Sequence, residues 1–309
     1  MPGLAEAVPA GPSAGTLDVG APAGVFVPPR VRPARAEDAE RVCRFLATPR
    51  MPATAWRPLF EHAWSAGWEG AAKGYLLVVG EERIVGFLAV TGAERRSGGR
   101  IARVWNLGIW SVIPDYRAWS LLLLQAATAD LDATYTDLTA VPAVGRVLQR
   151  MGFQPLDREM RLMPPFASLS TLHRRGALVE ADPVKVRALL GEADRRVFDD
   201  HAPYPCLQLA LLAEGRVAHI VLKRRVKRRI PVSWLMRCGD PVLLTAHLER
   251  VKLAALVRQR TLALVADARL LGAARPVGIA LARPVWFRSP TFTAADLDNL
   301  YSELVLLPI

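Results

Sequence analysis

The stretch of this sequence best suited to chemistry runs from Trp110 to Leu124. Its apolar start is typical of a strand, the Pro114-Asp115 pair breaks that strand, and a Leu/Ala-rich run typical of a helix follows. The first N–H groups of a helix lack intrahelical partners and carry partial positive charge. The stretch therefore predicts a seat for a phosphate group, with Tyr116 and Arg117 at its opening.

A second chemically distinctive stretch is the run Lys223–Arg229, which holds six positive charges in seven residues. One interpretation is a site for a polyanion, such as an acidic polysaccharide, a nucleic acid or a phosphorylated cofactor. The alternative, which we favour, is a solvated hairpin tip between two apolar strands. The run contains no aromatic residue on which bases could stack, so a nucleic-acid partner is not expected.

Composition narrows the class of protein. The chain has 309 residues, 51% of them hydrophobic, and a formal net charge of +11, which favours anionic partners in general. Much of that charge is Arg in an Ala-rich chain, so it is weak support for nucleic-acid binding. The three cysteines, Cys43, Cys206 and Cys238, lie far apart without metal-ligand spacing, which predicts no metal site and a reducing compartment.

The sequence also predicts a cytoplasmic protein. No basic segment followed by a hydrophobic stretch opens the chain, and runs such as Leu207–Leu212 are much shorter than the roughly 18–20 residues of a membrane-spanning helix. Residues 1–29 are rich in Pro, Gly and Ala, which predicts a disordered tail.

Two ordered domains are expected, at residues 30–165 and 166–309. The first reads as strand, two helices, three strands, a long helix, a strand, a helix and a strand. Its predicted elements are a short strand at Arg30; a helix that ends near Ala47 and a second helix at 54–66; strands at 75–79, 84–90 and 101–112, with a loop at 93–100; a helix at 116–133; a strand at 135–141; and a helix at 143–151, which Gly152 ends.

The second domain looks like a degraded repeat of the first. Residues 208–221 and 75–88 share the same pattern of strand, turn with Glu, Arg and strand. A helix at 183–200, a strand at 230–236, a helix at 247–260 and a strand at 262–266 are expected around it, with a short helix and a closing strand within 296–307. The alternative is an unrelated α+β domain that shares one ordinary hairpin.

In this order of elements the chain resembles the GNAT superfamily, whose members transfer acyl groups from acyl-CoA. The resemblance covers roughly residues 30–165. It is carried by five segments in the family's order and spacing: Val31–Asp38, Glu82–Val90, Val112–Arg117, Leu121–Leu124 and Leu148–Phe153. It implies an α/β (α+β) fold of two GNAT-like domains, each with a mixed, mainly antiparallel sheet flanked by helices, the second domain being degenerate.

The resemblance also implies a cofactor site. In the family, the pattern Arg/Gln-x-x-Gly-x-Gly/Ala grips the pyrophosphate of CoA with backbone amides. Ser120 stands here where glycine is usual, and Leu122 stands where glycine or alanine is usual, so the chain departs from the pattern at both positions. The implied cofactor-binding residues are Val112, Arg117, Ala118, Trp119, Ser120, Leu121 and Leu122, and the implied co-substrate is acetyl-CoA or another acyl-CoA.

The implied catalytic residues are less complete. The family often has a glutamate on the strand before the phosphate loop, whereas residues 103–112 contain no carboxylate, and Leu148 stands at the usual tyrosine position. Glu61 and His62 could supply a base through water, although we favour the interpretation that they belong to an ordinary solvated helix surface. Tyr116 could reach a thiolate or only fasten the start of the helix.

Three functional hypotheses follow. The leading one is an acyl-CoA-dependent N-acyltransferase that acts on a small-molecule or peptide amine. Its rival is a catalytically inactive GNAT-fold binding or regulatory protein, favoured by Leu122, by Leu148 and by the missing carboxylate. Nucleic-acid binding through Lys223–Arg229 is the third and weakest.

Overall fold

A computed structural model describes residues 27–65, 71–165, 176–227 and 229–308 of the chain. The tail predicted for residues 1–29 therefore lies outside the described residues, apart from its last three. We refer to residues 30–165 as the first half and to residues 176–308 as the second half.

One twelve-stranded sheet runs through both halves. Its strands are β1 (Arg30–Pro33), β2 (Gly74–Val79), β3 (Arg83–Ser97), β4 (Arg100–Val112), β5 (Thr134–Asp137), β6 (Gln154–Met163), β7 (Ala177–Glu180), β8 (Cys206–Ala213), β9 (Arg216–Lys227), β10 (Ile230–Cys238), β11 (Ala263–Asp267) and β12 (Ile279–Arg288).

Helices cover both faces of this sheet. The α-helices are α1 (Ala39–Leu46), α2 (Pro58–Glu61), α3 (Ser120–Ala127), α4 (Pro142–Arg150), α6 (Pro183–Leu189), α7 (Glu192–His201), α8 (Pro241–Ala246), α9 (Leu248–Gln259) and α10 (Glu303–Leu306). The 3-10 helices are η1 (Ala36–Asp38), η2 (Ala53–Trp56), η3 (Pro114–Trp119), η4 (Ala268–Leu271) and η5 (Ala294–Asp296).

The strand order is symmetric about the centre of the sheet. It runs β1-β2-β3-β4-β5-β12-β6-β11-β10-β9-β8-β7, so each strand of the first half has a counterpart in the second half at the same distance from the centre. The pairs β4–β5 and β10–β11 are parallel, and the other neighbours are antiparallel. The mixed, mainly antiparallel sheet predicted from the sequence is confirmed.

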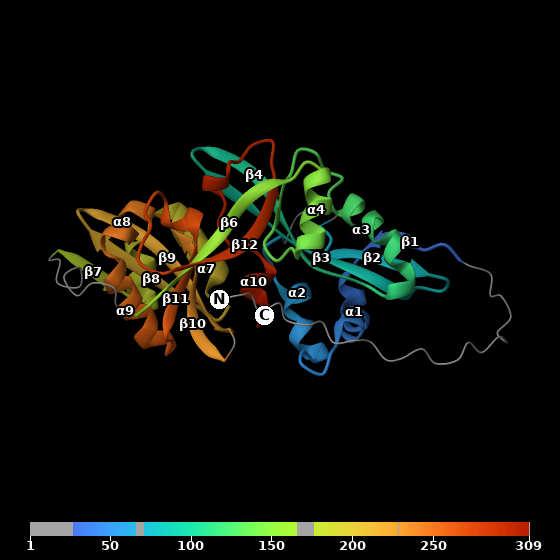
Figure 1. Ribbon diagram of the computed structural model, residues 1–309, viewed down its shortest axis with the longest axis horizontal. Coiled ribbons are helices and arrows are strands. Elements are labelled where there is room, and N and C mark those ends of the chain that lie inside the picture. Colours follow the sequence, from blue (N-terminus) through green and yellow to red (C-terminus); the bar gives the residue numbers. More distant parts are fainter. Residues whose placement is uncertain (1–26, 66–70, 166–175, 228, 309) are drawn as a thin grey trace, which may run out of the picture.

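The sixth strand of each half lies beside the fifth strand of the other half. Strand β12 pairs with β5, and β6 pairs with β11, while β6 and β12 pair with each other at the centre. Figure 1 shows β6 and β12 crossing the middle of the molecule, between the blue-to-green and the yellow-to-orange parts of the chain. The sheet hydrogen bonds therefore join the halves into one body.

The core of the first half lies on both faces of its sheet. Alternate residues of β2 serve the two faces, because side chains alternate along a strand. Leu77 and Val79 pack with the α3–α4 side, whereas Leu76 and Val78 pack with the α1–α2 side, which α10 joins through Leu306 and Leu307.

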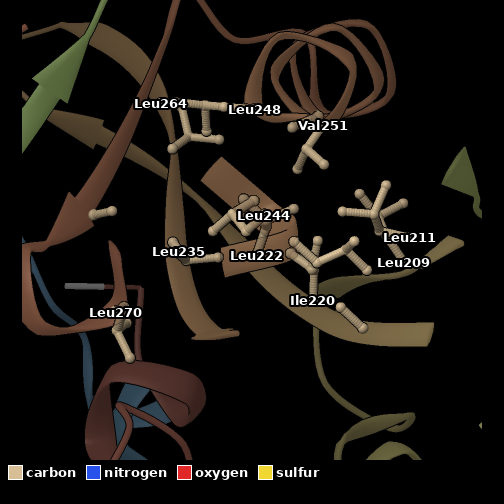
Figure 2. Packing of buried hydrophobic residues seen from close by; sticks show 14 of the residues in the cluster. Leu209, Leu211, Ile220, Leu222, Leu235, Leu244, Leu248, Val251, Leu264 and Leu270 are labelled. Carbon is tan, nitrogen blue, oxygen red and sulfur yellow. The ribbon is translucent and has the colours of Figure 1, made fainter. Parts of the chain in front are cut away.

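The second half has its own core, in which α8 and α9 pack on β8–β11. Figure 2 shows Leu244 of α8 and Leu248 and Val251 of α9 over strand residues such as Leu209, Ile220 and Leu235. All six side chains are at most 6% exposed. These helices occupy the position that α3 has in the first half, after the fourth strand and before the fifth.

Several predicted boundaries are wrong, each for a local reason. The expected loop at 93–100 is strand, because β3 and β4 stay paired as far as a two-residue turn at Gly98 and Gly99, both with positive φ. The expected strand at 135–141 ends at Asp137, whose carboxylate accepts a hydrogen bond from the Thr139 N–H (3.0 Å).

Three predicted helices are shorter than expected. Within the stretch 54–66, the described residues as far as 65 form only η2 and α2, and His62 is already extended. The stretch 116–133 is 3-10 helix as far as Trp119 and α-helix only to Ala127, where the Thr128 hydroxyl bonds to the Leu124 carbonyl oxygen. The stretch 183–200 is broken between α6 and α7 at residues 190–191.

The prediction for the end of the chain is also partly wrong. Residues 296–307 contain the expected short helix, α10, but its expected closing strand is absent from residues 297–308, which the structure describes in full. The last strand of the chain is β12, at 279–288 in the centre of the sheet, which the sequence did not indicate.

Candidate functional site

The first half has a gap where two parallel strands separate. Strands β4 and β5 pair only from Val104 with Thr134 to Leu107 with Asp137, and β4 then runs on to Val112. Beyond Leu107 that edge of β4 has no strand beside it. Divergence of parallel strands exposes backbone N–H and C=O groups, which can bond to a ligand.

A β-bulge marks the same point of β4. Gly108 and Ile109 together face Ala89, because Leu107 pairs with Val90 and Trp110 pairs with Leu88. Bulges re-aim side chains and occur often beside active sites. Here Ile109 packs on the α1–α2 side, and a Cβ built on Gly108 would lie 3.2 Å from the Glu303 Oε2.

Glu303 of α10 is the carboxylate that lies in this gap. Its side chain is fully buried and accepts hydrogen bonds from the Asn106 Nδ2 of β4 and from the Thr139 Oγ1, the latter at 2.8 Å. The Thr136 Oγ1 donates to the Asn106 Oδ1 (3.2 Å), which orients the Asn106 amide. The gap thus holds the acidic side chain that β4 itself lacks.

A second carboxyl group, that of Asp137, lies next to Glu303. Burial and then the charge of Glu303 raise the pKa of Asp137 to about 7. Hydrogen bonds from the backbone N–H groups of Thr139 and Ala140 oppose this rise, because they favour the carboxylate. Burial also raises the pKa of Glu303, despite its hydrogen bonds and the nearby Arg225. Two neighbouring buried carboxyls resist simultaneous ionisation, so the pair favours holding a proton near neutral pH.

The basic run holds α10 in place. Lys223 is 3% exposed, and its Nζ donates to the carbonyl oxygens of Leu304, Val305 and Leu307 at the end of α10. Arg225 is 7% exposed and donates to the Leu304 oxygen (3.0 Å). A cation at a helix C-terminus is favourable. The favoured interpretation of this run as a solvated hairpin tip is therefore wrong for these two inward-facing side chains.

The equivalent gap in the second half, between β10 and β11, is closed by the chain itself. The Asn299 N–H donates to the Met236 carbonyl oxygen (2.9 Å) on the edge of β10. Asp267 ends β11 as Asp137 ends β5, but its Oδ2 accepts from both Arg269 (2.8 Å) and Arg283 (2.7 Å). This gap is filled by a buried ionic network.

The predicted phosphate seat has a different backbone from the one expected. It is a 3-10 helix, η3, in which the Tyr116 N–H bonds to the Ile113 oxygen (3.1 Å) and the Ser120 N–H bonds to the Arg117 oxygen. A 3-10 turn engages each N–H with the carbonyl three residues earlier, so fewer amides are open to an anion. The backbone of η3 therefore offers fewer phosphate-binding amides than the predicted start of an α-helix would.

The side chains of the seat divide between surface and core. Arg117 and Ala118 are exposed, and Leu121 is 40% exposed. Among the described residues no carboxylate forms an ion pair with Arg117, so its guanidinium is available to an anion. The half-buried members are Val112, Trp119, Ser120 and Leu122, of which Val112 and Trp119 pack on the α3-side core.

The three predicted acid–base candidates do not come together. Glu61 is exposed at the end of α2, whereas His62 is 3% exposed, and burial together with the charge of Lys73 lowers the pKa of His62 to about 3. The Tyr116 hydroxyl accepts a hydrogen bond from Arg83 (3.3 Å) near the β2–β3 turn. Among the described residues, the carboxyl group set against the bulge is instead that of Glu303.

Sequence reasoning missed Glu303 because it lies 164 and 197 residues from its partners Thr139 and Asn106. The signal was present, since Glu303 is the one charged residue in the run Leu300–Leu307. A charge within an apolar, buried segment is costly unless it has partners, and it commonly has a functional or structural purpose.

Within the described ranges no helix is long and apolar enough to cross a membrane. The same residues contain no group of three or more His, Cys, Asp or Glu side chains placed to hold a metal ion.

Comparison with known proteins places this geometry in a known fold. No protein-family model matches the chain, and no curated protein is similar to it in sequence. Solved structures are similar in fold. A GCN5-related N-acetyltransferase from Kribbella flavida is 14% identical, with a TM-score of 0.53, and the match covers 86% of this chain and 72% of that one.

Two further structures agree. A GCN5-related N-acetyltransferase from Anabaena variabilis is 11% identical, with a TM-score of 0.52, over 84% of this chain and 72% of that one. A conserved protein from Enterococcus faecalis, described as a probable N-acyltransferase, is 12% identical, with a TM-score of 0.52, over the same shares of the two chains. At these identities the likeness establishes the fold.

Proposed function

Because the chain has the fold of the GCN5-related N-acetyltransferases, we propose that it is an acyl-CoA-dependent N-acyltransferase whose first half binds the acyl donor. The acceptor is an amine of a small molecule or a peptide. The CoA pyrophosphate binds at the residues from Val112 to Leu122, and the acyl group enters the gap between β4 and β5.

The observation that carries this proposal is the gap itself. The unpaired edge of β4 from Gly108 to Val112 leads from a buried carboxylate to the turn with the exposed Arg117. The amide groups of an extended acyl-CoA arm can bond to such an edge as a strand does, and a guanidinium at its end can bind phosphate. Carboxylate, strand edge and cation thus lie in the order that an acyl-CoA requires.

The second half is proposed to be a degenerate copy of the first, with the boundary near residue 165. The symmetric strand order and the matching parallel pairs support this duplication. Asn299 and the Asp267–Arg269–Arg283 network occupy the equivalent gap, so this copy binds no acyl-CoA. Its contribution is β12, which pairs with β5, and α10, which carries Glu303 into the first gap.

Calorimetric titration of the full chain with acetyl-CoA and with CoA tests the donor site. Both ligands should bind, and the Arg117→Ala variant should bind roughly tenfold more weakly, because one charge-assisted phosphate contact is lost. The matched control is Arg44→Ala, which removes the same charge from the surface of α1, on the opposite face of the sheet. Absence of heat at millimolar acetyl-CoA and CoA would rule out the donor site.

A non-enzymatic GNAT-fold protein is the second candidate. It is favoured by two observations, the 3-10 hydrogen bonds of η3 and the complete burial of Glu303 in the gap. This candidate predicts that no thiol is released from acetyl-CoA in the presence of primary amines, even where CoA binds. Thiol release that depends on Arg117 would exclude it.

A further inference from the structure

The buried carboxylate in the gap has an unusual origin, since it comes from the second half of the chain. Asn106, whose amide binds it, precedes it by 197 residues. Resting on the function proposed above, we infer that Glu303 is the proton acceptor for the amine substrate, so the C-terminal helix of one half supplies the base for the other.

Its position fits this role. Gly108 has no side chain, which lets the Glu303 carboxylate lie directly on the bulge of β4, where a Cβ would be 3.2 Å from its Oε2. The bulge lies where β4 and β5 separate, which is the place where an acyl group entering along β4 would end. A base at that point is adjacent to the reacting carbonyl carbon.

The orientation of the carboxylate is fixed from two sides. Asn106 and Thr139 each donate to one of its oxygens, which leaves a further lone pair on each oxygen to take a proton. Thr136 holds the Asn106 amide with its Nδ2 toward Glu303. Asn106 and Thr139 are thus positioning residues, and Glu303 is the group that exchanges the proton.

The charges around Glu303 support proton uptake near neutral pH. Asp137 of β5 faces it as a second carboxyl, and Arg225 of β9 and Arg283 of β12 face it as cations. Burial and Asp137 favour the protonated form, whereas the two arginines favour the carboxylate. The balance keeps the pKa of Glu303 above its ordinary value.

Glu303 takes one proton from the substrate ammonium, and the free nitrogen lone pair forms the C–N bond with the thioester carbonyl carbon. The tetrahedral intermediate collapses, the C–S bond breaks, and the sulfur leaves with the bonding electrons. The second proton of the nitrogen passes to the CoA sulfur, and Glu303 releases its proton to solvent. Amide, CoA thiol and one proton are the products.

The test compares wild type and Glu303→Gln as full chains, with acetyl-CoA and the amines benzylamine, spermidine and a lysine-containing peptide. Free thiol release gives the rate, and calorimetry gives the acetyl-CoA affinity. The variant should lose about 10²-fold or more in rate, with affinity changed by less than about twofold, and should lose the acidic limb of the pH–rate profile. The control is Glu249→Gln, which alters a buried carboxyl of α9.

A second variant tests the same site if Glu303→Gln does not fold. Thr139 is exposed, so Thr139→Ala should fold, and it should lower the maximal rate and shift the acidic limb without changing the KM for acetyl-CoA. Thr139→Ser keeps the hydroxyl and should restore both. A loss of rate that serine does not restore would contradict the positioning role.

The two proposals fail in different ways. If wild type releases thiol and Glu303→Gln matches it within about threefold, with the same pH profile, the function stands and Glu303 is not the base. Faster turnover in Glu303→Gln overturns the inference as well, because the carboxylate would then block the gap. If folded wild type releases no thiol with any of the three amines, the proposed function itself is overturned.

Discussion

At the scale of single residues, the molecule is distinguished by the buried carboxyl pair of Asp137 and Glu303. Each carboxyl is buried beside the other, and the backbone amides, Asn106 and Thr139 compensate only in part. Buried like charges raise the free energy of the native state unless one of them is protonated. The arrangement therefore costs stability, as is common for groups that act on protons.

Asp137→Asn should change how stability depends on pH. The native pKa of Asp137, about 7, lies above its ordinary value of 3.8, so the native state holds a proton that the unfolded state releases between those two values. The free energy of unfolding of wild type should thus fall between about pH 4 and pH 7, by about 1.4 kcal/mol for each unit of raised pKa. Asparagine cannot ionise, and the variant should lack this decline.

Urea unfolding of both proteins at pH 4.5 and pH 8 measures the difference. The stability of the variant relative to wild type should increase with pH, whereas Asp132→Asn, at an exposed carboxylate, should show no such trend. If the free energies of unfolding of Asp137→Asn and wild type differ by the same amount at both pH values, the raised pKa of Asp137 is contradicted.

The sequence was informative about this site only where its signals are local. The strand, the Pro114 break and the position of Arg117 could be predicted, because they depend on neighbouring residues. The 3-10 form of η3 was missed, since propensity does not distinguish it from the first turns of an α-helix. Glu303 was missed because nothing local links it to Gly108 and Asn106.

At the scale of elements, α10 depends on a lysine as its end cap. Four residues are too few for a stable isolated helix, so α10 is held by packing and by its contacts with β9. Lys223 and Arg225 point inward while Arg224 is exposed, as the two-residue period of a strand requires. The sequence could not indicate which charges point inward, because both faces of the strand carry Lys or Arg and the one apolar residue of the run, Val226, lies on the exposed face.

Lys223→Met should loosen α10 while keeping the length of the side chain. The carbonyl groups of Val305 and Leu307 would lose their buried donor, at a cost of roughly 1–3 kcal/mol for each group left unpaired, whereas the Leu304 carbonyl would keep its bond from Arg225. Hydrogen exchange of residues 303–307 should become faster, and the melting temperature should fall. Lys227→Met, at an exposed position of the same strand, is the control. If the amides of α10 exchange hydrogen at the same rate in the two variants, Lys223 is not the end cap of this helix.

At the scale of the whole molecule, the exchange of β6 and β12 decides how the chain folds. Every hydrogen-bonding neighbour of β6 belongs to the second half, and so does β12, which pairs with β5 on the edge away from β4. The hairpins β2–β3 and β8–β9 could be predicted from the strand and turn patterns of their segments. The exchange could not, because a strand that pairs within its own half and one that pairs with the other half have the same local pattern.

The halves should therefore not fold separately. A fragment of residues 30–165 would leave β5 and β6 without β12 and would lack α10 over the gap. It should show no cooperative thermal transition, and the full chain should melt in a single transition, because unpaired edges and an exposed core cannot be sustained alone. Calorimetric scans of both measure this. A fragment with its own sharp transition would refute the coupling.

The exchange also sets the order of events during synthesis. A ribosome adds about 5–20 residues per second, so roughly 10–40 s separate the emergence of Asn106 from that of Glu303, 197 residues later. Throughout that interval the nascent first half lacks β12, so the edge of β5 that pairs with β12 has no partner strand. A truncated product would be left with an open sheet edge that quality control can recognise, and any proton-accepting site at Glu303 would exist only in chains completed beyond that residue.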